Sequence, residues 1–128
     1  MAKTTQITVA AESRPGVLAK VSRALADAGV NIVALCAGET AGRGKIRMVV
    51  SDPARAKQVL TAAKIRCAEE GALLLSLEDR PGALARVTER LAAAKINIKC
   101  AYATTGGSAS AQVVLVVANP EKAERALG

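Results

Sequence analysis

The sequence contains one segment twice, and this repeat constrains the fold more than any other feature. Glu12–Ala19 reads ESRPGVLA, and Glu78–Ala85 reads EDRPGALA. In both places an apolar pattern of helical spacing follows, and an Asn-Ile pair comes after it at the same distance. A sequence repeated at a fixed offset indicates two copies of one structural unit.

The repeat divides the 128 residues into two domains, which we expect over residues 1–70 and 71–128. A unit of this length is only marginally stable alone, so we expect the two to support each other. Hydrophobic residues make up 51% of the chain and aromatic residues 1%. The core is therefore expected to consist of Ala, Val, Leu and Ile, with Tyr102 as its one ring.

Composition also excludes several classes of protein. No apolar run approaches the ~20 residues that cross a bilayer, and the polar start Met1–Gln6 lacks the apolar region of a signal peptide, so we expect a cytoplasmic protein without membrane contact. Three cysteines and no histidine give neither a disulfide framework nor a usual zinc site. We expect no metal and no cofactor.

Each half reads as strand, helix, strand, strand, helix. Alternating apolar residues open each half, and residues at helical spacing follow Pro15 and Pro81. The second strands are expected from Val30 and Ile96, with Cys36, Cys100 and Tyr102 on the face that the helices cover. The inward residues of the third strands are expected to be Ile46, Met48 and Val50 in one half and Val113, Leu115 and Val117 in the other.

Asp52-Pro53 and Asn119-Pro120 each place a capping side chain before a proline, which predicts the start of a second helix in each half. The first half continues far enough for a short fourth strand, whereas the second stops on its helix at Gly128. Without that strand, residues 72–77 would keep an open row of backbone donors and acceptors. We expect the neighbouring unit or a second chain to cover this edge.

The pattern of strand, Arg-Pro-Gly-x-Leu-Ala, helix and Asn-Ile closely resembles the ACT domain, and both halves carry it. The resemblance covers almost the whole chain and is strongest to small stand-alone proteins made of two ACT units. It implies an α+β fold of two ferredoxin-like βαββαβ units, with antiparallel sheets and helices on one face, the second unit lacking its last strand. It also implies a non-enzymatic, allosteric regulatory protein that binds an amino acid, forms a homodimer and regulates an enzyme.

In this family, effectors are held between modules by the loop after the first strand of one module and the start of the second strand of its neighbour. Carried onto this chain, the loop at 13–18 would act with Asn97, and the loop at 79–84 with Asn31. The resemblance thus implies the ligand-binding residues Ser13, Arg14, Pro15, Gly16, Val17, Leu18, Asn31, Ile32, Asp79, Arg80, Pro81, Gly82, Ala83, Leu84, Asn97 and Ile98.

The residues themselves support an anion site at each loop. The first amides of each helix, Gly16–Leu18 and Gly82–Leu84, have no partner within the helix, and a ligand carboxylate fits there. Asp79 could accept a ligand ammonium group, whereas Ser13 at the equivalent place cannot supply that charge. We therefore expect the Asp79 loop with Asn31 to be the better site.

Plainer interpretations compete with binding. Ser13 and Asp79 could act only as helix caps, and the two asparagines could only hold the turn into the strand. The alternative function is therefore a structural interaction module with no small-molecule ligand. Catalysis has no supporting motif.

The net charge of +7 raises the question of nucleic acid. RNA recognition by a sheet stacks bases on exposed aromatic rings, and this chain has one Tyr and neither Phe nor Trp, so we expect no nucleic-acid partner. The one local basic cluster, Arg43, Lys45 and Arg47, is interpreted as a solvated hairpin end.

Overall fold

The elements follow each other in the order that the repeat predicts, with one difference: the short fourth strand expected at the end of the first half and the first strand of the second half form one continuous strand, Cys67–Glu78. The computed structural model describes residues 2–105 and 109–128 of the chain, and the α+β fold expected from the sequence is confirmed. Its elements are β1 (Ala2–Glu12), α1 (Val17–Asp27), β2 (Ile32–Thr40), β3 (Arg43–Val50), α2 (Pro53–Ala62), β4 (Cys67–Glu78), α3 (Ala83–Ala93), β5 (Ile98–Thr105), β6 (Ser110–Val117) and α4 (Pro120–Leu127). Among the residues described, no helix is both long and apolar enough to span a membrane. The turn expected over 104–110 includes 106–108, which lie outside the described residues.

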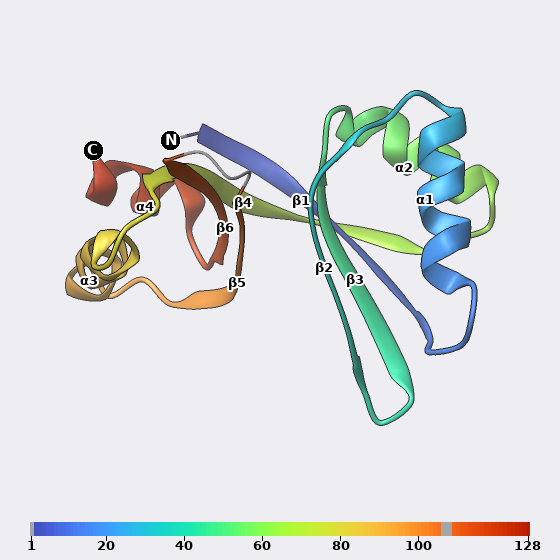
Figure 1. Cartoon of the computed structure of the whole chain (residues 1–128), viewed down its shortest axis with the longest axis horizontal. Helices are drawn as coiled ribbons and strands as arrows, with labels where there is room; N and C mark the ends of the chain where they lie inside the picture. The colour runs from blue at the N-terminus through green and yellow to red at the C-terminus, as the bar shows by residue number, and fades with distance from the viewer. Residues whose placement is uncertain (1, 106–108) are drawn as a thin grey trace. The chain divides into compact units, whose positions relative to one another are not determined.

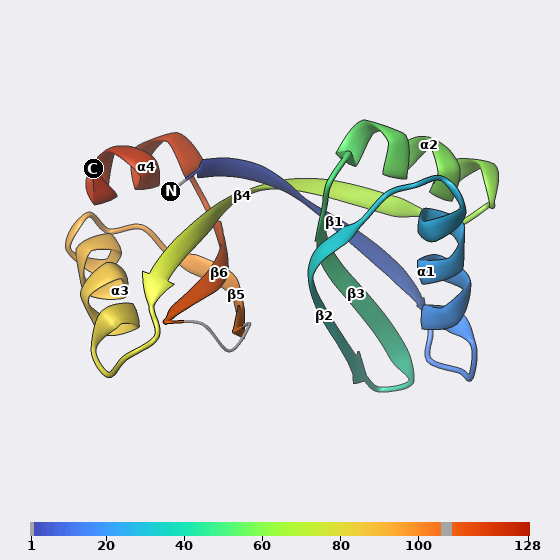
Figure 2. The same cartoon turned by 45° about the horizontal axis from the view of Figure 1, so that its top comes forward.

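By internal contacts, the chain divides into two compact units. The N-terminal unit contains Gln6–Glu70, and the C-terminal unit contains Gly71–Gly128 together with residues 2–5. In each unit the two helices lie on one face of the strands (Figure 1; Figure 2). The expected domains, 1–70 and 71–128, stay a prediction, and the compact units differ from them in where residues 2–5 belong.

Residues 2–5 take the place of the strand that the second repeat lacks. The strand order is β2-β3-β1-β4-β6-β5, so β4 has β1 on one side and β6 on the other. The pairing of β1 with β3 begins at Gln6, and residues 2–5 group with the C-terminal unit. The edge of β4 that the sequence leaves open is therefore covered by the start of the first strand of the same chain.

Each unit has an aliphatic core between its helices and strands. In the N-terminal unit the core includes Val21 and Leu25 of α1 and Leu60 of α2. In the C-terminal unit the equivalent layer includes Leu91 of α3 and Ala123 of α4. The inward residues predicted for the third strands all belong to these cores, which confirms the period assigned to β3 and β6.

Proline and the residue before it start the second helix of each unit, as expected. The side chain of Asp52 accepts a hydrogen bond from the Arg55 amide at 3.1 Å, and the side chain of Asn119 accepts one from the Lys122 amide at 3.0 Å. Such a cap satisfies one of the amides that a helix start leaves without a partner.

A β-bulge in β2 reverses part of the expected facing pattern. The register of β2 against β3 shifts between Ile32 and Ala34. Beyond the shift, Leu35 lies opposite the core residue Met48 and faces the helices, so Cys36 faces the other way. The expectation that Cys36 lies under the helices is wrong, because one extra residue moves every later side chain to the opposite face.

The same irregularity recurs in β5, between Ile98 and Cys100. Ala101 lies opposite the core residue Leu115, which places Cys100 and Tyr102 on the face away from the helices. The core ring expected at Tyr102 is therefore absent from the core of the C-terminal unit, and Cys100 is not among the residues packed under the helices there.

The end of each first helix uses a left-handed residue. Gly29 has φ of 73° after α1, and Lys95 has φ of 59° at the equivalent place after α3. Behind them, the Val30 amide donates to Leu25 O at 2.9 Å and the Ile96 amide donates to Leu91 O at 2.9 Å. The geometry is the same, but Lys95 carries a Cβ in a region that favours glycine.

We therefore predict that Lys95→Gly raises the free energy of unfolding by about 1 kcal/mol, since relief of the left-handed strain exceeds the entropy that glycine adds to the unfolded chain. The matched change Gly29→Ala should lower it by a similar amount. Urea denaturation measures both, and a loss of stability in Lys95→Gly would contradict this account.

Removal of the first five residues should uncover β4. Losing even two backbone hydrogen bonds would lower the stability of the C-terminal unit by about 1–3 kcal/mol. Hydrogen exchange should then speed up in β4 and β6, while the β2–β3 hairpin serves as the internal control and keeps its protection. Unchanged exchange in β4 would show that residues 2–5 do not hold this edge.

Candidate functional site

The repeated Pro-Gly pair forms a tight turn that starts the first helix of each unit. Gly16 has φ of 91° and ψ of −7°, and the Val17 amide donates to Arg14 O at 3.4 Å. Gly82 has φ of 90° and ψ of −14° in the equivalent turn. Proline followed by a left-handed glycine is the signature of a type II turn, which explains why the repeat keeps this pair.

Neither Ser13 nor Asp79 caps its helix. The cap positions belong to Gly16 and Gly82, and neither helix start has a side-chain cap. Instead, the Ser13 amide donates to Gly42 O at 3.0 Å and the Asp79 amide donates to Ala109 O at 2.8 Å. The backbone of each loop is thus tied to the neighbouring hairpin, and the capping alternative for these two residues is wrong.

The expected row of open amides is shorter than the sequence suggests. In each turn the middle amide, of Val17 or Ala83, donates to the backbone. In the described part of the N-terminal unit, the amides of Gly16, Leu18 and Ala19 have no backbone acceptor. The start of α1 therefore still offers donors, with the partial positive charge of the helix behind them.

A cavity of about 370 Å³ lies beside this helix start, wholly within the N-terminal unit. It is lined by the end of β1, the loop at 13–14, the first turn of α1, the end of β2 and the start of β3. Of the residues expected to bind ligand, it brings together Ser13, Arg14, Val17 and Leu18.

The strand register explains why this space is empty. Ala11 of β1 lies opposite Gly44 of β3, and Gly44 lies opposite Glu39 of β2. Opposed residues of antiparallel strands point to one face, which here is the helix face, because Val9 lies opposite Ile46 two residues along. Two minimal side chains therefore leave a hollow, and Glu39 stands at its end.

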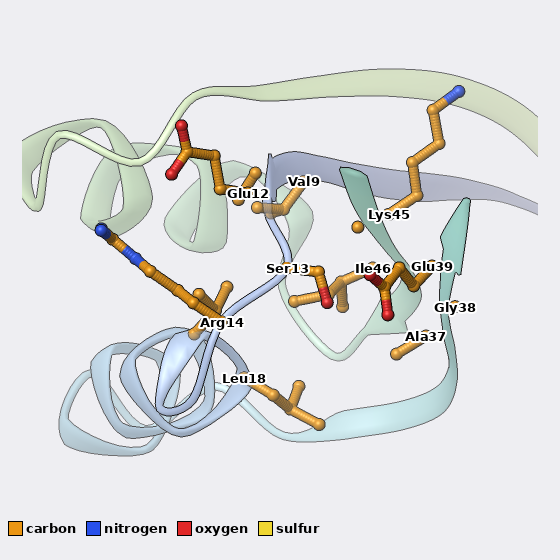
Figure 3. Close-up of a pocket in the computed structure, with 13 residues that line it drawn as sticks. Val9, Glu12, Ser13, Arg14, Leu18, Ala37, Gly38, Glu39, Lys45 and Ile46 are labelled. Carbon is orange, nitrogen blue, oxygen red and sulfur yellow. The ribbon is translucent and has the colours of Figure 1, made fainter. Parts of the chain in front are cut away.

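The charged residues around the cavity differ in direction. Glu39 and Ser13 point into the cavity, whereas Glu12, Arg14 and Lys45 extend away from it (Figure 3). Within the described chain, no ion pair to the Glu39 carboxylate is formed. The cavity therefore presents one carboxylate to a ligand.

Leu18 supplies an apolar rim. It is 41% exposed and points toward Ala37 across the mouth of the cavity (Figure 3). Its equivalent Leu84 is 48% exposed on α3. A leucine left partly uncovered beside a cavity gives a ligand apolar surface to cover.

The two asparagines lie at the other end of the first helix of each unit. The backbone of Asn31 exchanges hydrogen bonds with Ser51, whose Oγ accepts at 2.9 Å and whose amide donates at 2.9 Å. Asn97 O accepts from the Ala118 amide at 3.4 Å. Their side chains are exposed, while Ile32 and Ile98 pack against the cores. Within one unit, the length of α1, ~16 Å, separates Asn31 from the loop at 13–18; pairing of each loop with the other unit's asparagine stays a prediction.

The second loop has different surroundings. Arg80 and Ala83 line a wider cavity of about 660 Å³ that runs along α3, and Arg80 forms an ion pair with Glu78. Asp79, Pro81 and Gly82 are exposed residues of the turn. The stronger binding expected of the Asp79 loop stays a prediction.

The C-terminal unit has larger residues at the place equivalent to the hollow. In the C-terminal unit, Leu77 lies opposite Ala111, and Ala111 lies opposite Thr105. Leu77 packs against the core there. At the positions of Ala11, Gly44 and Glu39, the C-terminal unit therefore has Leu77, Ala111 and Thr105.

The basic cluster lies on the opposite face of the hairpin. Arg43, Lys45 and Arg47 are alternate residues of β3, and Lys45 lies opposite Gly38. All three line a second cavity of about 360 Å³ together with Gly38, Glu39 and Thr40. Glu39 and Lys45 thus border both cavities, although the Glu39 carboxylate points into the first one and Lys45 extends away from it (Figure 3).

Sequence reasoning missed Glu39, Gly44 and Ala37. The signal was present, because Leu35, Ala37 and Glu39 alternate within β2. The prediction instead placed Cys36 and its alternate neighbours on the helix face. The bulge between Ile32 and Ala34 makes that assignment wrong for the second half of the strand.

Comparison with known proteins agrees with the fold and the repeat. The family model described as an ACT domain pair matches residues 2–127. No sequence among curated proteins matches the chain. Protein BT0572 from Bacteroides thetaiotaomicron has 30% identity and a TM-score of 0.90, over 98% of this chain and 86% of its own.

Two more distant structures share the fold. The ligand-free regulatory subunit of aspartate kinase from Thermus thermophilus has 22% identity and a TM-score of 0.72, over 98% of this chain and 91% of that subunit. The aspartate kinase of Clostridium acetobutylicum has 16% identity and a TM-score of 0.64, over 98% of this chain and 32% of that enzyme. The tandem repeat, the twin Pro-Gly turns and the match over nearly the whole length place this chain in the family of ACT domain pairs.

Proposed function

We propose that this chain is a non-enzymatic regulatory protein that binds a free amino acid at the start of α1. The observation that carries the proposal is the cavity beside the Ser13 loop, into which Glu39 points. ACT domains are regulatory modules, and the cavity lies at one of the two loops that the family resemblance marks.

The two ends of the cavity suit the two charges of an amino acid. The Glu39 carboxylate would accept a charge-assisted hydrogen bond from the ligand ammonium group. The ligand carboxylate would accept a hydrogen bond from the amide of Leu18, which lines the cavity and has no backbone acceptor in the described chain. The helix dipole favours an anion at this end.

Binding would act on a partner through coupled equilibria. An amino acid that binds one conformation of the N-terminal unit more tightly would favour that conformation, and a partner that prefers it would sense the ligand with a coupling of ~1–3 kcal/mol. One structural neighbour is named as a regulatory subunit of aspartate kinase. We infer by analogy that the partner is an enzyme of amino-acid metabolism, and that the chain acts as a homodimer.

A thermal-shift screen of the twenty amino acids at millimolar concentration tests the proposal. Saturation at about a hundred times Kd stabilises the folded chain by about 2.7 kcal/mol, which raises Tm by several degrees. Glu39→Gln should remove most of this shift, because the ligand ammonium loses its charged acceptor. Glu121→Gln, an exposed substitution in α4, should leave the shift unchanged.

A screen in which no amino acid raises Tm would refute amino-acid binding. If a stable protein partner were then captured by the unliganded chain, the alternative function would replace it, namely a structural interaction module without a small-molecule ligand.

A further inference from the structure

We infer that the cavity of the N-terminal unit selects an α-amino acid with an uncharged aliphatic side chain. This inference rests on the proposed function and adds the class of ligand. The composition of the cavity walls, the direction of the charges around them and the depth of the hollow all favour such a ligand.

The walls that face the ligand side chain are aliphatic. Val9 and Ile46 are buried at the floor, and Val17 and Leu18 cover it from α1. Six apolar residues line the cavity in total, namely Val9, Ala11, Val17, Leu18, Ala37 and Ile46. An apolar ligand side chain gains free energy for each methylene that it buries against such walls.

A charged side chain on the ligand would find no partner among the charged residues that line the cavity. Glu39 is the lining carboxylate that points inward, and the ligand ammonium group engages it. Arg14 and Lys45, which could pair with an acidic ligand side chain, extend away from the cavity (Figure 3). A second ligand charge would lose its hydration without a compensating partner, which costs more than the contacts return.

The hollow has room for several methylenes. A Cβ placed on Gly44 would meet Ala11 O at 3.6 Å, Gly38 O at 3.8 Å and Ser13 Cα at 3.9 Å, all ordinary contacts. A larger side chain on Gly44 would then extend from the sheet toward the helices, into the hollow. The equivalent place in the C-terminal unit already has Leu77 and Ala111, so this selectivity belongs to the N-terminal unit.

Calorimetric titration of the full chain with alanine, 2-aminobutyrate, norvaline and norleucine tests the inference. Affinity should rise about fourfold for each added methylene until the cavity is full. Lysine has the same four-carbon side chain as norleucine with a charged ammonium group at its end. It should bind at least tenfold more weakly than norleucine. Aspartate and glutamate should bind more weakly than 2-aminobutyrate and norvaline.

Gly44→Val places three carbons in the hollow. In this variant, affinity should no longer rise with the length of the ligand side chain. Norleucine should lose at least tenfold in affinity, while alanine should change by less than threefold. The control Ala111→Val makes a similar change at the equivalent position of the other unit and should leave the series intact. Circular dichroism and Tm establish that each variant is folded, and the series on the unaltered chain remains decisive if a variant is not.

Amino acids that bind without the methylene increment, or lysine or aspartate that binds more tightly than norleucine, would overturn the aliphatic inference and leave the proposed function standing. A methylene increment that survives in Gly44→Val would overturn the assignment to this cavity. Absence of binding by any amino acid would overturn the proposed function itself.

Discussion

The pairing of one strand edge governs the rest of this structure. The edge of β4 opposite β6 carries backbone groups that must find partners, and residues 2–5 of β1 provide them. β1 and β4 consequently have 11 and 12 residues, longer than most strands, because each contributes to both units. The second half of β1, fixed against β3 from Gln6 to Glu12, then supplies the floor of the cavity.

The repeat predicted the number of units, the order of elements and the faces of β3 and β6, because hydrophobic spacing and turn residues are local signals. Capping by Asp52 and Asn119 was equally local and is confirmed. The role of residues 2–5 is not local. Nothing in Lys3 or Thr4 identifies which strand they join, since that choice depends on an edge some 70 residues away.

The candidate site was likewise predictable only where the signal in the sequence is local. The Pro-Gly turn was visible in the sequence, and Ser13, Arg14, Val17 and Leu18 do line one cavity. Glu39 was missed because the bulge in β2 changes the phase of alternation after Ile32, and a strand with small residues on both faces gives no warning of the change. The bulge is therefore the feature that turns Glu39 to the face of the sheet on which the cavity beside α1 lies.

The role of residues 2–5 also has a consequence for synthesis. Residues 2–5 are made before β4, with most of the N-terminal unit between them, so they have no strand partner until synthesis reaches β4. Contacts between segments so distant in the sequence slow folding. Until β4 is made, residues 2–5 lack their strand partner, and a bulky segment placed directly before them would hinder their pairing with β4 and so the completion of the C-terminal unit.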